Sequence, residues 1–153
     1  MFYPDRVKGY AEARRVLTQG GSYIFNVWDH IGVNEFADAV TDAVAEIFPD
    51  DPPRFLSRTP HGYHDVQVVR DDLCAAGFSD ITIVTREDIS RAPSPWHPAV
   101  AYCQGTPMRN EIEARDASLL ELVADRATEA IAKRYGHGPV ASKIQAHIVT
   151  AVK

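Results

Sequence analysis

The hydrophobic pattern of the first thirty residues predicts a helix followed by a strand. Apolar residues recur at intervals of three and four over residues 4–18, which is the spacing of one face of a helix. Gly20 and Gly21 then supply the permissive backbone that ends helices. Residues 22–28, SYIFNVW, are strand formers that are apolar on both alternating sets apart from Asn26. This run predicts a strand covered on both faces, as in a parallel sheet with helices on each side.

The rest of the chain alternates proline-rich connections with helical patterns and two further strands. Four prolines and little periodicity mark residues 49–64, which predicts a surface loop. Glycine closes the next helical pattern at Gly77, and alternation of apolar and polar residues marks the strands that follow. The predicted elements are a helix from Asn34 to Phe48, a loop over 49–64, a helix over 65–76, a strand over 79–86, a loop over 87–98, a helical insertion over 99–136 and a strand over 143–153.

These elements predict an α/β fold with about three main strands and flanking helices. The chain has 153 residues, of which 45% are hydrophobic and 24% are charged. A chain of this length buries about two thirds of the surface that it exposes when unfolded, which is enough for a core without disulfides or metals. We therefore expect one domain over residues 1–153.

Charge and cysteine content narrow the classes of partner. The chain has sixteen Lys and Arg residues and twenty-one Asp and Glu residues, which gives a net charge of −5. No domain-wide positive field is therefore present to attract nucleic acid. The apolar runs are far shorter than the roughly 20 residues that cross a bilayer, and no membrane association is expected. Cys74 and Cys103 have no second cysteine at the spacing of a metal or redox motif, which favours reduced thiols in a cytoplasmic protein.

Two motifs at helix-to-strand junctions resemble those of a known family. The first is ARRVLTQGG and the second is LCAAGF. In order and spacing they are similar to the C-terminal half of a class I S-adenosylmethionine-dependent methyltransferase of the small-molecule, type 11-like group. In that family a pattern like RVLKPGG leads into the fifth strand of a Rossmann-like sheet, and a pattern like LLxAGF leads into the sixth. The matching residues are Arg15, Val16, Leu17, Gly20 and Gly21 for the first motif, and Leu73, Ala76, Gly77 and Phe78 for the second.

This resemblance implies where cofactor and methyl acceptor would lie. The opening residues resemble the point where the family's fourth strand ends, which implies that Phe2, Tyr3 and Asp5 lie at the edge of the cofactor. The segment that follows the second helix would approach the acceptor. A later patch mixes aromatic and hydrogen-bonding groups of the kind that line small-molecule pockets. The candidate substrate-binding residues are Arg58, His61, Tyr63, His64, Tyr102 and Arg109, and no catalytic residue is assigned.

The part of the family that holds the cofactor has no counterpart in the sequence. It requires a glycine-rich turn that follows a strand and opens a helix, whereas Gly136 and Gly138 lie between a predicted helix and a strand. We therefore expect a truncated methyltransferase-like protein that does not bind S-adenosylmethionine or transfer methyl groups alone. The alternative is a small-ligand or protein-binding module that retains the acceptor-side pocket. A longer parent protein is a third possibility.

Two further expectations concern metals and self-association. His61 and His64 are three residues apart and Asp65 follows, a set that can bind a metal, relay a proton or cap a helix. Since no third ligand has matching spacing, no metal is expected. The family's fifth strand lies beside a fourth that this chain lacks, so residues 22–28 would expose an apolar edge. We expect a homodimer in which a second copy covers strand edges or the apolar faces of the first two helices.

Overall fold

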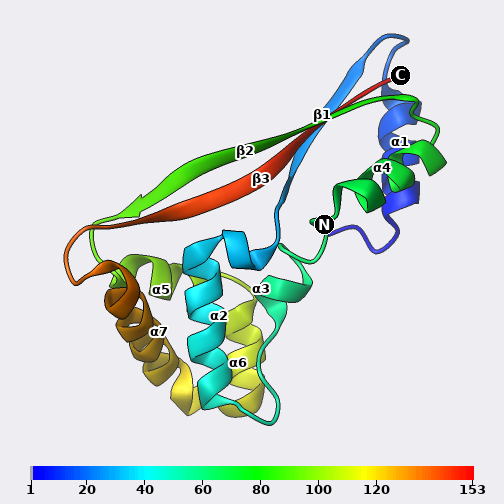
Figure 1. Cartoon of the computed structure of the whole chain (residues 1–153). Coiled ribbons are helices and arrows are strands. Elements are labelled where there is room, and N and C mark those ends of the chain that lie inside the picture. The colour runs from blue at the N-terminus through cyan, green and yellow to red at the C-terminus, as the bar shows by residue number, and fades with distance from the viewer. Residues whose placement is uncertain (1) are drawn as a thin grey trace. The chain divides into compact units, whose positions relative to one another are not determined.

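The computed structural model describes residues 2–153, which form two compact units (Figure 1). The sheet unit contains the residues up to His30 together with 59–87 and 145–153. The helical unit contains 31–58 and 88–144. Because both units combine segments that are separated in the sequence, neither is an independent stretch of chain. The single domain expected from the sequence therefore stays a prediction.

Three strands form one open sheet in the order β1-β3-β2: β1 (Ser22–Trp28), β3 (Val140–Val152) and β2 (Asp80–Ala92) (Figure 1). β3 is antiparallel to both neighbours, and its register places Ser22 opposite Val152 and Trp28 opposite Ala146. Since β1 and β2 both run opposite to β3, they run parallel to each other. The predicted α/β class with three strands and flanking helices is confirmed.

The prediction that β1 is covered on both faces is wrong. Tyr23, Phe25 and Val27 pack into the core of the sheet unit, whereas the side chains between them are exposed and Ile24 is 64% accessible. The sequence suggested two covered faces because Ile24 is apolar. β1 instead pairs antiparallel with β3 and buries one alternating set, the usual pattern of antiparallel sheets.

Two helices of the sheet unit, α1 (Arg6–Val16) and α4 (Val66–Ala75), pack against one another and over this buried face. Each begins at a capping aspartate. Asp5 accepts a hydrogen bond from Lys8 N–H at 2.9 Å, and Asp65 accepts one from Gln67 N–H at 2.8 Å. These bonds satisfy amide groups that a helix leaves free at its start. The buried core of this unit consists of Tyr10, Val27, Tyr63, Val69, Leu73, Ala76, Phe78, Val149 and Ala151.

Glycines with positive φ connect both helices to the strands that follow. Gly20, at φ +78°, lies in a turn in which Gly21 N–H donates to Thr18 C=O at 2.9 Å. Gly77, at φ +96°, follows α4, where Phe78 N–H donates to Leu73 C=O at 3.1 Å. This second arrangement is a Schellman motif, which requires a left-handed residue at the glycine position. The chain thus repeats the order helix, glycine, strand.

Replacing Gly77 by Ala should lower the free energy of unfolding by about 1–2 kcal/mol, because a Cβ makes the left-handed conformation costly. The added Cβ would also lie 3.4 Å from the Arg14 side chain. Gly138→Ala is the control, since nothing lies within 4 Å of the position of its Cβ. Urea unfolding curves measure both, and equal effects of the two substitutions would contradict the assignment.

The helical unit contains α2 (Glu35–Ile47), α3 (Phe55–Arg58), α5 (Trp96–Cys103), α6 (Met108–Asp116) and α7 (Leu120–Tyr135), with short 3-10 turns at Ile31–Val33 and Ala117–Leu119. Both α2 and α5 pack on α7. The largest buried side chains of this second core are Phe36, Val40, Val44, Leu56, Met108, Ile112, Val123 and Ile131. None of the helices formed by residues 2–153 combines the length and apolar character needed to span a membrane.

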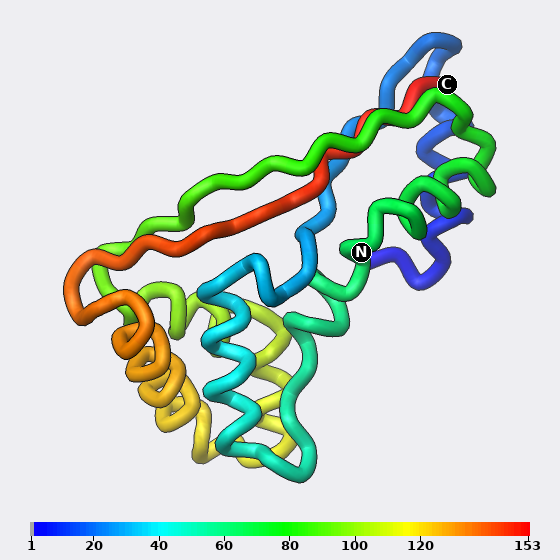
Figure 2. The backbone as a smooth tube through the Cα atoms, viewed as in Figure 1, coloured from blue at the N-terminus to red at the C-terminus, as the bar shows by residue number. Residues whose placement is uncertain are grey.

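Three predicted boundaries differ from the structure. The predicted loop over 49–64 contains α3, whose Phe55 and Leu56 are buried. Residues 87–92 of the predicted loop over 87–98 belong to β2, and β3 begins at Val140 instead of 143. Figure 2 traces β2 and β3 beside one another. Residues 87–89 are exposed, so strand pairing, and not burial, extends β2 through them. The hydrophobic pattern of the sequence therefore does not predict this part of the strand.

Candidate functional site

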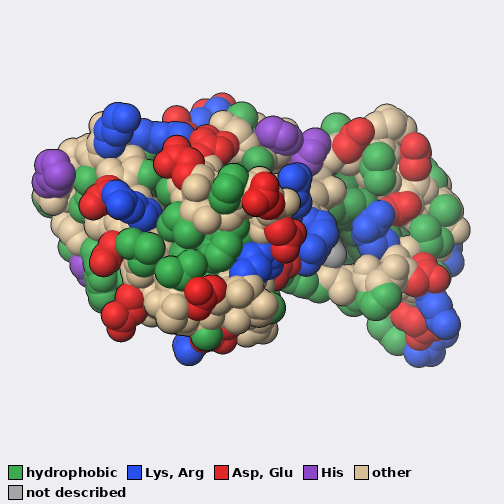
Figure 3. Space-filling view, turned by 90° about the horizontal axis from the view of Figure 1, so that it is seen from below, with side chains coloured by type: hydrophobic (Ala, Val, Ile, Leu, Met, Phe, Trp, Pro, Cys, Tyr) green, Lys and Arg blue, Asp and Glu red, His purple; other side chains and the backbone are tan. Residues whose placement is uncertain are grey.

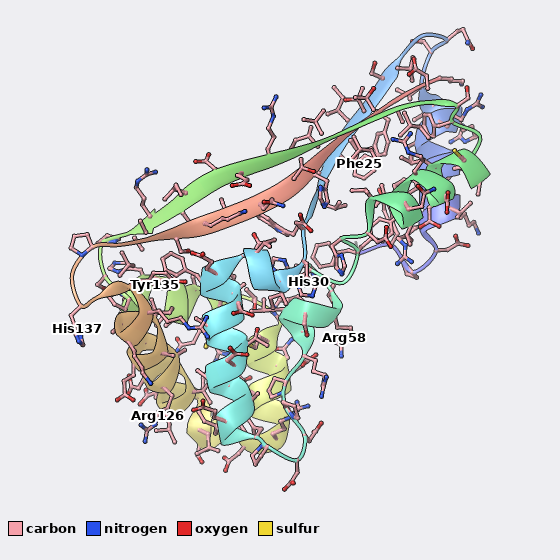
Figure 4. All side chains as sticks on the ribbon, viewed as in Figure 1. Phe25, His30, Arg58, Arg126, Tyr135 and His137 are labelled. Atoms are coloured by element: carbon pink, nitrogen blue, oxygen red, sulfur yellow. The ribbon has the colours of Figure 1, made fainter. Side chains whose placement is uncertain are left out.

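Polar side chains gather around Asp29, the residue that follows β1 in the sheet unit. Four of the six histidines of the chain contact Asp29 or one another there: His30, His61, His64 and His147. Thr85 and Gln145 complete the group, which we call the Asp29 cluster. Figure 4 labels His30, which lies just beyond the end of β1. Asp29 directly follows Trp28, the last residue of β1.

Both carboxylate oxygens of Asp29 have partners. Oδ1 accepts a hydrogen bond from His30 N–H at 2.6 Å and lies 3.3 Å from His147 Nε2. Oδ2 accepts a hydrogen bond from Gln145 Nε2 at 2.5 Å. Burial by itself would raise the pKa of Asp29, but these hydrogen bonds and the nearby His147 outweigh burial and hold the pKa below its usual value. The carboxylate is therefore ionised at neutral pH.

His147 connects Asp29 to a hydroxyl group. Its side chain lies on β3 and is only 5% accessible. Nδ1 lies 2.9 Å from the Thr85 Oγ1 atom on β2, while Nε2 faces Asp29. Asp29, His147 and Thr85 thus form a row across the three strands of the sheet.

His61 is held by the backbone of the same aspartate. Its Nδ1–H donates to Asp29 C=O at 2.8 Å, which fixes the neutral tautomer with a lone pair on Nε2. Burial lowers the pKa of His61, and the neighbouring His30 and His64 lower it further. The His30 and His64 rings stand nearly perpendicular with centroids 5.0 Å apart. His61 is therefore a neutral imidazole suited to accept a proton or a hydrogen bond.

The cluster favours proton transfer and hydrogen bonding over metal binding. Among residues 2–153, no group of three or more His, Cys, Asp or Glu side chains has an arrangement that could hold a metal ion. The visible face in Figure 3 has acidic and basic side chains interspersed, so that face presents no extended basic surface for a phosphate backbone.

The structure places the predicted site residues in several different environments. His61 and His64 belong to the Asp29 cluster, but Tyr63 is a core residue whose hydroxyl donates to Asp72 at 2.7 Å. Phe2 and Tyr3 are 69% and 48% accessible. Asp5 uses its carboxylate to cap α1, as described above.

The remaining candidates, Arg58, Tyr102 and Arg109, belong to the helical unit. Arg58 pairs with Glu111 at 2.7 Å, and Arg109 pairs with Glu113 at the same distance. Burial raises the pKa of Tyr102, so its hydroxyl stays protonated. The six proposed acceptor contacts are therefore divided between the two units, and both arginines already have a carboxylate partner.

Sequence reasoning missed Asp29, His30, Thr85, Gln145 and His147. Asp29 carried a usable signal, since it is a polar residue directly after a buried strand, where ligand-binding residues of α/β sheets gather. His147 carried no comparable signal, because it shares its alternating set on β3 with the polar Lys143 and Gln145. Their association with Thr85 depends on the strand order, which periodicity does not predict.

The lowered pKa of His61 predicts a pH-dependent stability. The pKa of His61 is lower in the folded chain than in the unfolded chain, so protonation favours the unfolded state. The contribution of His61 to the free energy of unfolding is therefore complete above the ordinary histidine pKa of about 6.5, and it is lost as the pH falls below that value. Urea midpoints should fall over this range in the unchanged chain and fall less in His61→Gln. Equal pH slopes in both proteins would contradict the prediction. The lowered pKa of Asp29 acts in a separate range, below about pH 4.

Comparison with known proteins does not assign a function to the Asp29 cluster. No family model matches the chain, and no curated protein matches it either. The resemblance to methyltransferases therefore rests on the two sequence motifs and on the elements in which they lie.

Proposed function

We propose that the chain is the C-terminal, acceptor-side half of a class I S-adenosylmethionine-dependent methyltransferase domain that is inactive alone and pairs with a second copy through β1. The supporting observation is the repeated order of helix, glycine and strand. Both sequence motifs lie at equivalent points of this repeat, one at the end of α1 and before β1, the other at the end of α4 and before β2.

The strand directions support the same proposal. β1 and β2 each follow a helix and run in the same direction, an order of helix and strand that doubly wound sheets repeat. β3 lies between them and is antiparallel to both. A simple antiparallel meander would instead place β2 beside β1.

In the parent family the methyl donor is S-adenosylmethionine, held by a glycine-rich turn between a strand and a helix. Gly136 and Gly138 connect α7 to β3, which is the opposite order. The remaining candidates at the cofactor edge are Phe2, Tyr3 and Asp5, two exposed rings and a carboxylate that caps a helix. His61 and His64 remain as proposed acceptor contacts.

The two edges of the sheet differ in a way that favours self-association at β1. β1 carries no charged side chain, whereas β2 carries Asp80, Arg86, Glu87, Asp88 and Arg91. Charges on an edge strand oppose pairing with another chain. The uncharged β1 edge, with Ile24 exposed beside it, therefore fits a second copy of this chain.

Hydrogen bonds at both ends of the β1–β3 ladder show which backbone groups face the open edge. Asp29 N–H donates to Gln145 C=O at 3.1 Å, and Lys153 N–H donates to Gly21 C=O at 3.0 Å. Antiparallel bonding alternates along a strand, so the odd-numbered residues of β1 bond to β3. The amide groups of Ser22, Ile24 and Asn26 point outward, where a second strand can bind them.

Calorimetry with S-adenosylmethionine tests the proposed lack of a donor site. We expect no heat of binding at micromolar to millimolar cofactor for the isolated chain. Tight binding of one cofactor per chain would contradict the proposal that the donor half is missing. We also expect saturating S-adenosylmethionine to leave the melting temperature of the chain unchanged, because a ligand that binds the folded state raises the melting temperature.

A second candidate function is small-ligand or protein binding without transfer chemistry. The observation that favours it is a groove of about 750 Å³ in the helical unit, lined by α2 and α7. Its lining combines apolar residues with side chains of both charges: Ala39, Ala43, Ile47, Leu122 and Ala130 with Asp42, Glu46, Glu129, Arg126, Lys133 and Arg134. A thermal-shift screen in which one ligand class raises the melting temperature, and Ala43→Glu abolishes the shift, would favour this function.

We propose that the protein is located in the cytoplasm, because both of its cysteines are free thiols. Cys74 is exposed and Cys103 is buried, and both are free. Burial raises the pKa of Cys103 to about 12, which keeps its thiol protonated and unreactive at neutral pH. Free thiols are typical of reducing compartments.

A further inference from the structure

The row of Asp29, His147 and Thr85 has the connectivity of a nucleophile, a base and an acid that orients the base. Thr85 Oγ1 lies 2.9 Å from His147 Nδ1. The buried His147 Nε2 makes no hydrogen bond, and Asp29 Oδ1 lies 3.3 Å from it, at ion-pair distance. A hydroxyl within hydrogen-bond reach of a base that a third group orients is the geometric signature of an activated nucleophile.

The position of Asp29 decides which nitrogen of His147 carries the proton. An ionised carboxylate beside Nε2 favours a hydrogen there, which leaves the lone pair on Nδ1. Nδ1 then accepts the hydrogen bond that the Thr85 hydroxyl donates. If His147 takes a second proton at Nδ1, the positive charge forms beside the Asp29 carboxylate. Gln145 holds the other oxygen of that carboxylate in place.

The three residues of this row differ in how accessible they are to solvent. His147 is buried and the Asp29 side chain is 17% accessible, whereas Thr85 is exposed. The Thr85 residue is therefore more accessible to solvent than its base and the supporting carboxylate. Shielding strengthens the electrostatic interaction between imidazolium and carboxylate.

Other hydroxyls of the chain have different partners. Thr41, Thr106 and Thr128 donate to the carbonyl four residues earlier in a helix. Ser94 lies 3.0 Å from His97 Nδ1, but no ion pair joins His97 to a carboxylate in residues 2–153. The Ser94–His97 pair is thus an internal comparison that has the hydroxyl and the imidazole without the acid.

We propose that Thr85 is a nucleophile that accepts acyl groups from activated esters, with His147 as its general base and Asp29 as the group that positions His147. Thr85 Oγ1 forms a bond to the acyl carbon while His147 Nδ1 takes the hydroxyl proton. The bond between the acyl carbon and the leaving oxygen then breaks, and the leaving group departs with the electron pair. The products are O-acyl-Thr85, imidazolium and an alkoxide or phenolate, which the imidazolium proton neutralises.

This acylation site does not depend on the proposed function, since it uses neither S-adenosylmethionine nor a second copy of the chain. The test uses p-nitrophenyl acetate as the acyl donor and the whole chain as the protein. Release of nitrophenolate gives the rate, and mass spectrometry of proteolytic peptides locates the acetyl group. Lys8, an exposed amine outside the cluster, serves as an internal standard for non-specific acetylation.

We expect acetyl-Thr85 to form at least about 100-fold faster than acetyl-Ser94, because the Ser94–His97 pair lacks the carboxylate that holds the base in the productive tautomer, a loss that can cost up to about 10⁴ in rate. Thr85→Val should abolish the adduct and Thr85→Ser should retain it. His147→Gln should slow its formation by about 100-fold. Thr82→Val, on the same strand and outside the row, should leave labelling unchanged.

Either of two results would overturn the proposal: labelling of Thr85 at the rate of Ser94, or an unchanged Thr85 rate in His147→Gln. Circular dichroism establishes whether His147→Gln folds. If it does not fold, the ratio of Thr85 to Ser94 labelling within the unchanged chain decides by itself. Labelling of Lys8 at equal rates in all variants confirms that the reagent and the protein concentration were matched.

Discussion

A chain carrying Ile24→Lys should be a monomer in solution, whereas the unchanged chain should be a dimer. Ile24 is 64% accessible, and its amide groups face the open edge of β1. The substitution places a charge on an uncharged edge strand and removes an exposed apolar side chain, and both changes oppose pairing with a second copy. Light scattering after size exclusion should show a two-fold fall in mass, from twice 16.9 kDa to 16.9 kDa.

Two companion variants sharpen this test. Asn26→Pro removes an amide hydrogen that points outward and leaves the ladder to β3 intact, so it should also give a monomer. Val84→Lys adds the same charge to β2, where the side chain is 40% accessible, and should leave the dimer unchanged. A dimer that survives Ile24→Lys and Asn26→Pro but dissociates on Val84→Lys would place the interface on the other edge.

Replacing Leu73 by Ala should destabilise the sheet unit by about 2–5 kcal/mol, the range for deletion of a fully buried leucine side chain. Leu73 is inaccessible on α4 and lies in the core beneath β1. The two tryptophans belong to different units, Trp28 to the sheet unit and Trp96 to the helical unit. In a Trp96→Phe background, fluorescence during urea unfolding therefore reports the sheet unit alone.

Val68→Ala provides the matched control on the same helix. Its side chain is 41% accessible, and surface substitutions usually change stability by about 0.5 kcal/mol or less. Similar losses for Leu73→Ala and Val68→Ala would show that α4 does not bury the face described here. A loss confined to Leu73→Ala supports the packing of α4 over the sheet.

The sequence predicts the elements of the sheet unit well because local signals mark them. Asp5 and Asp65 cap the helices, and Gly77 ends α4 with a conformation that few other residues adopt. The continuation of β2 through residues 87–92 carries no such signal, because these residues are largely polar and exposed and depend on a neighbouring strand. The prediction that β1 is covered on both faces fails for a related reason, because Ile24 is apolar but exposed.

The candidate site was less predictable, since it depends on which strands are neighbours. His61 and His64 stand out as a local motif, and both belong to the Asp29 cluster. Thr85 and His147 are 62 residues apart and meet because β3 lies between β1 and β2. Arg58 and Arg109 matched a ligand-binding composition, but each forms an ion pair with a glutamate of α6.

The mass of the unchanged chain in solution tests the central claim most directly. We propose that a second copy covers β1, the uncharged edge of the sheet. Light scattering across a range of micromolar concentrations should give twice 16.9 kDa, with dissociation only on dilution. A well-folded monomer of 16.9 kDa at every concentration would contradict the account.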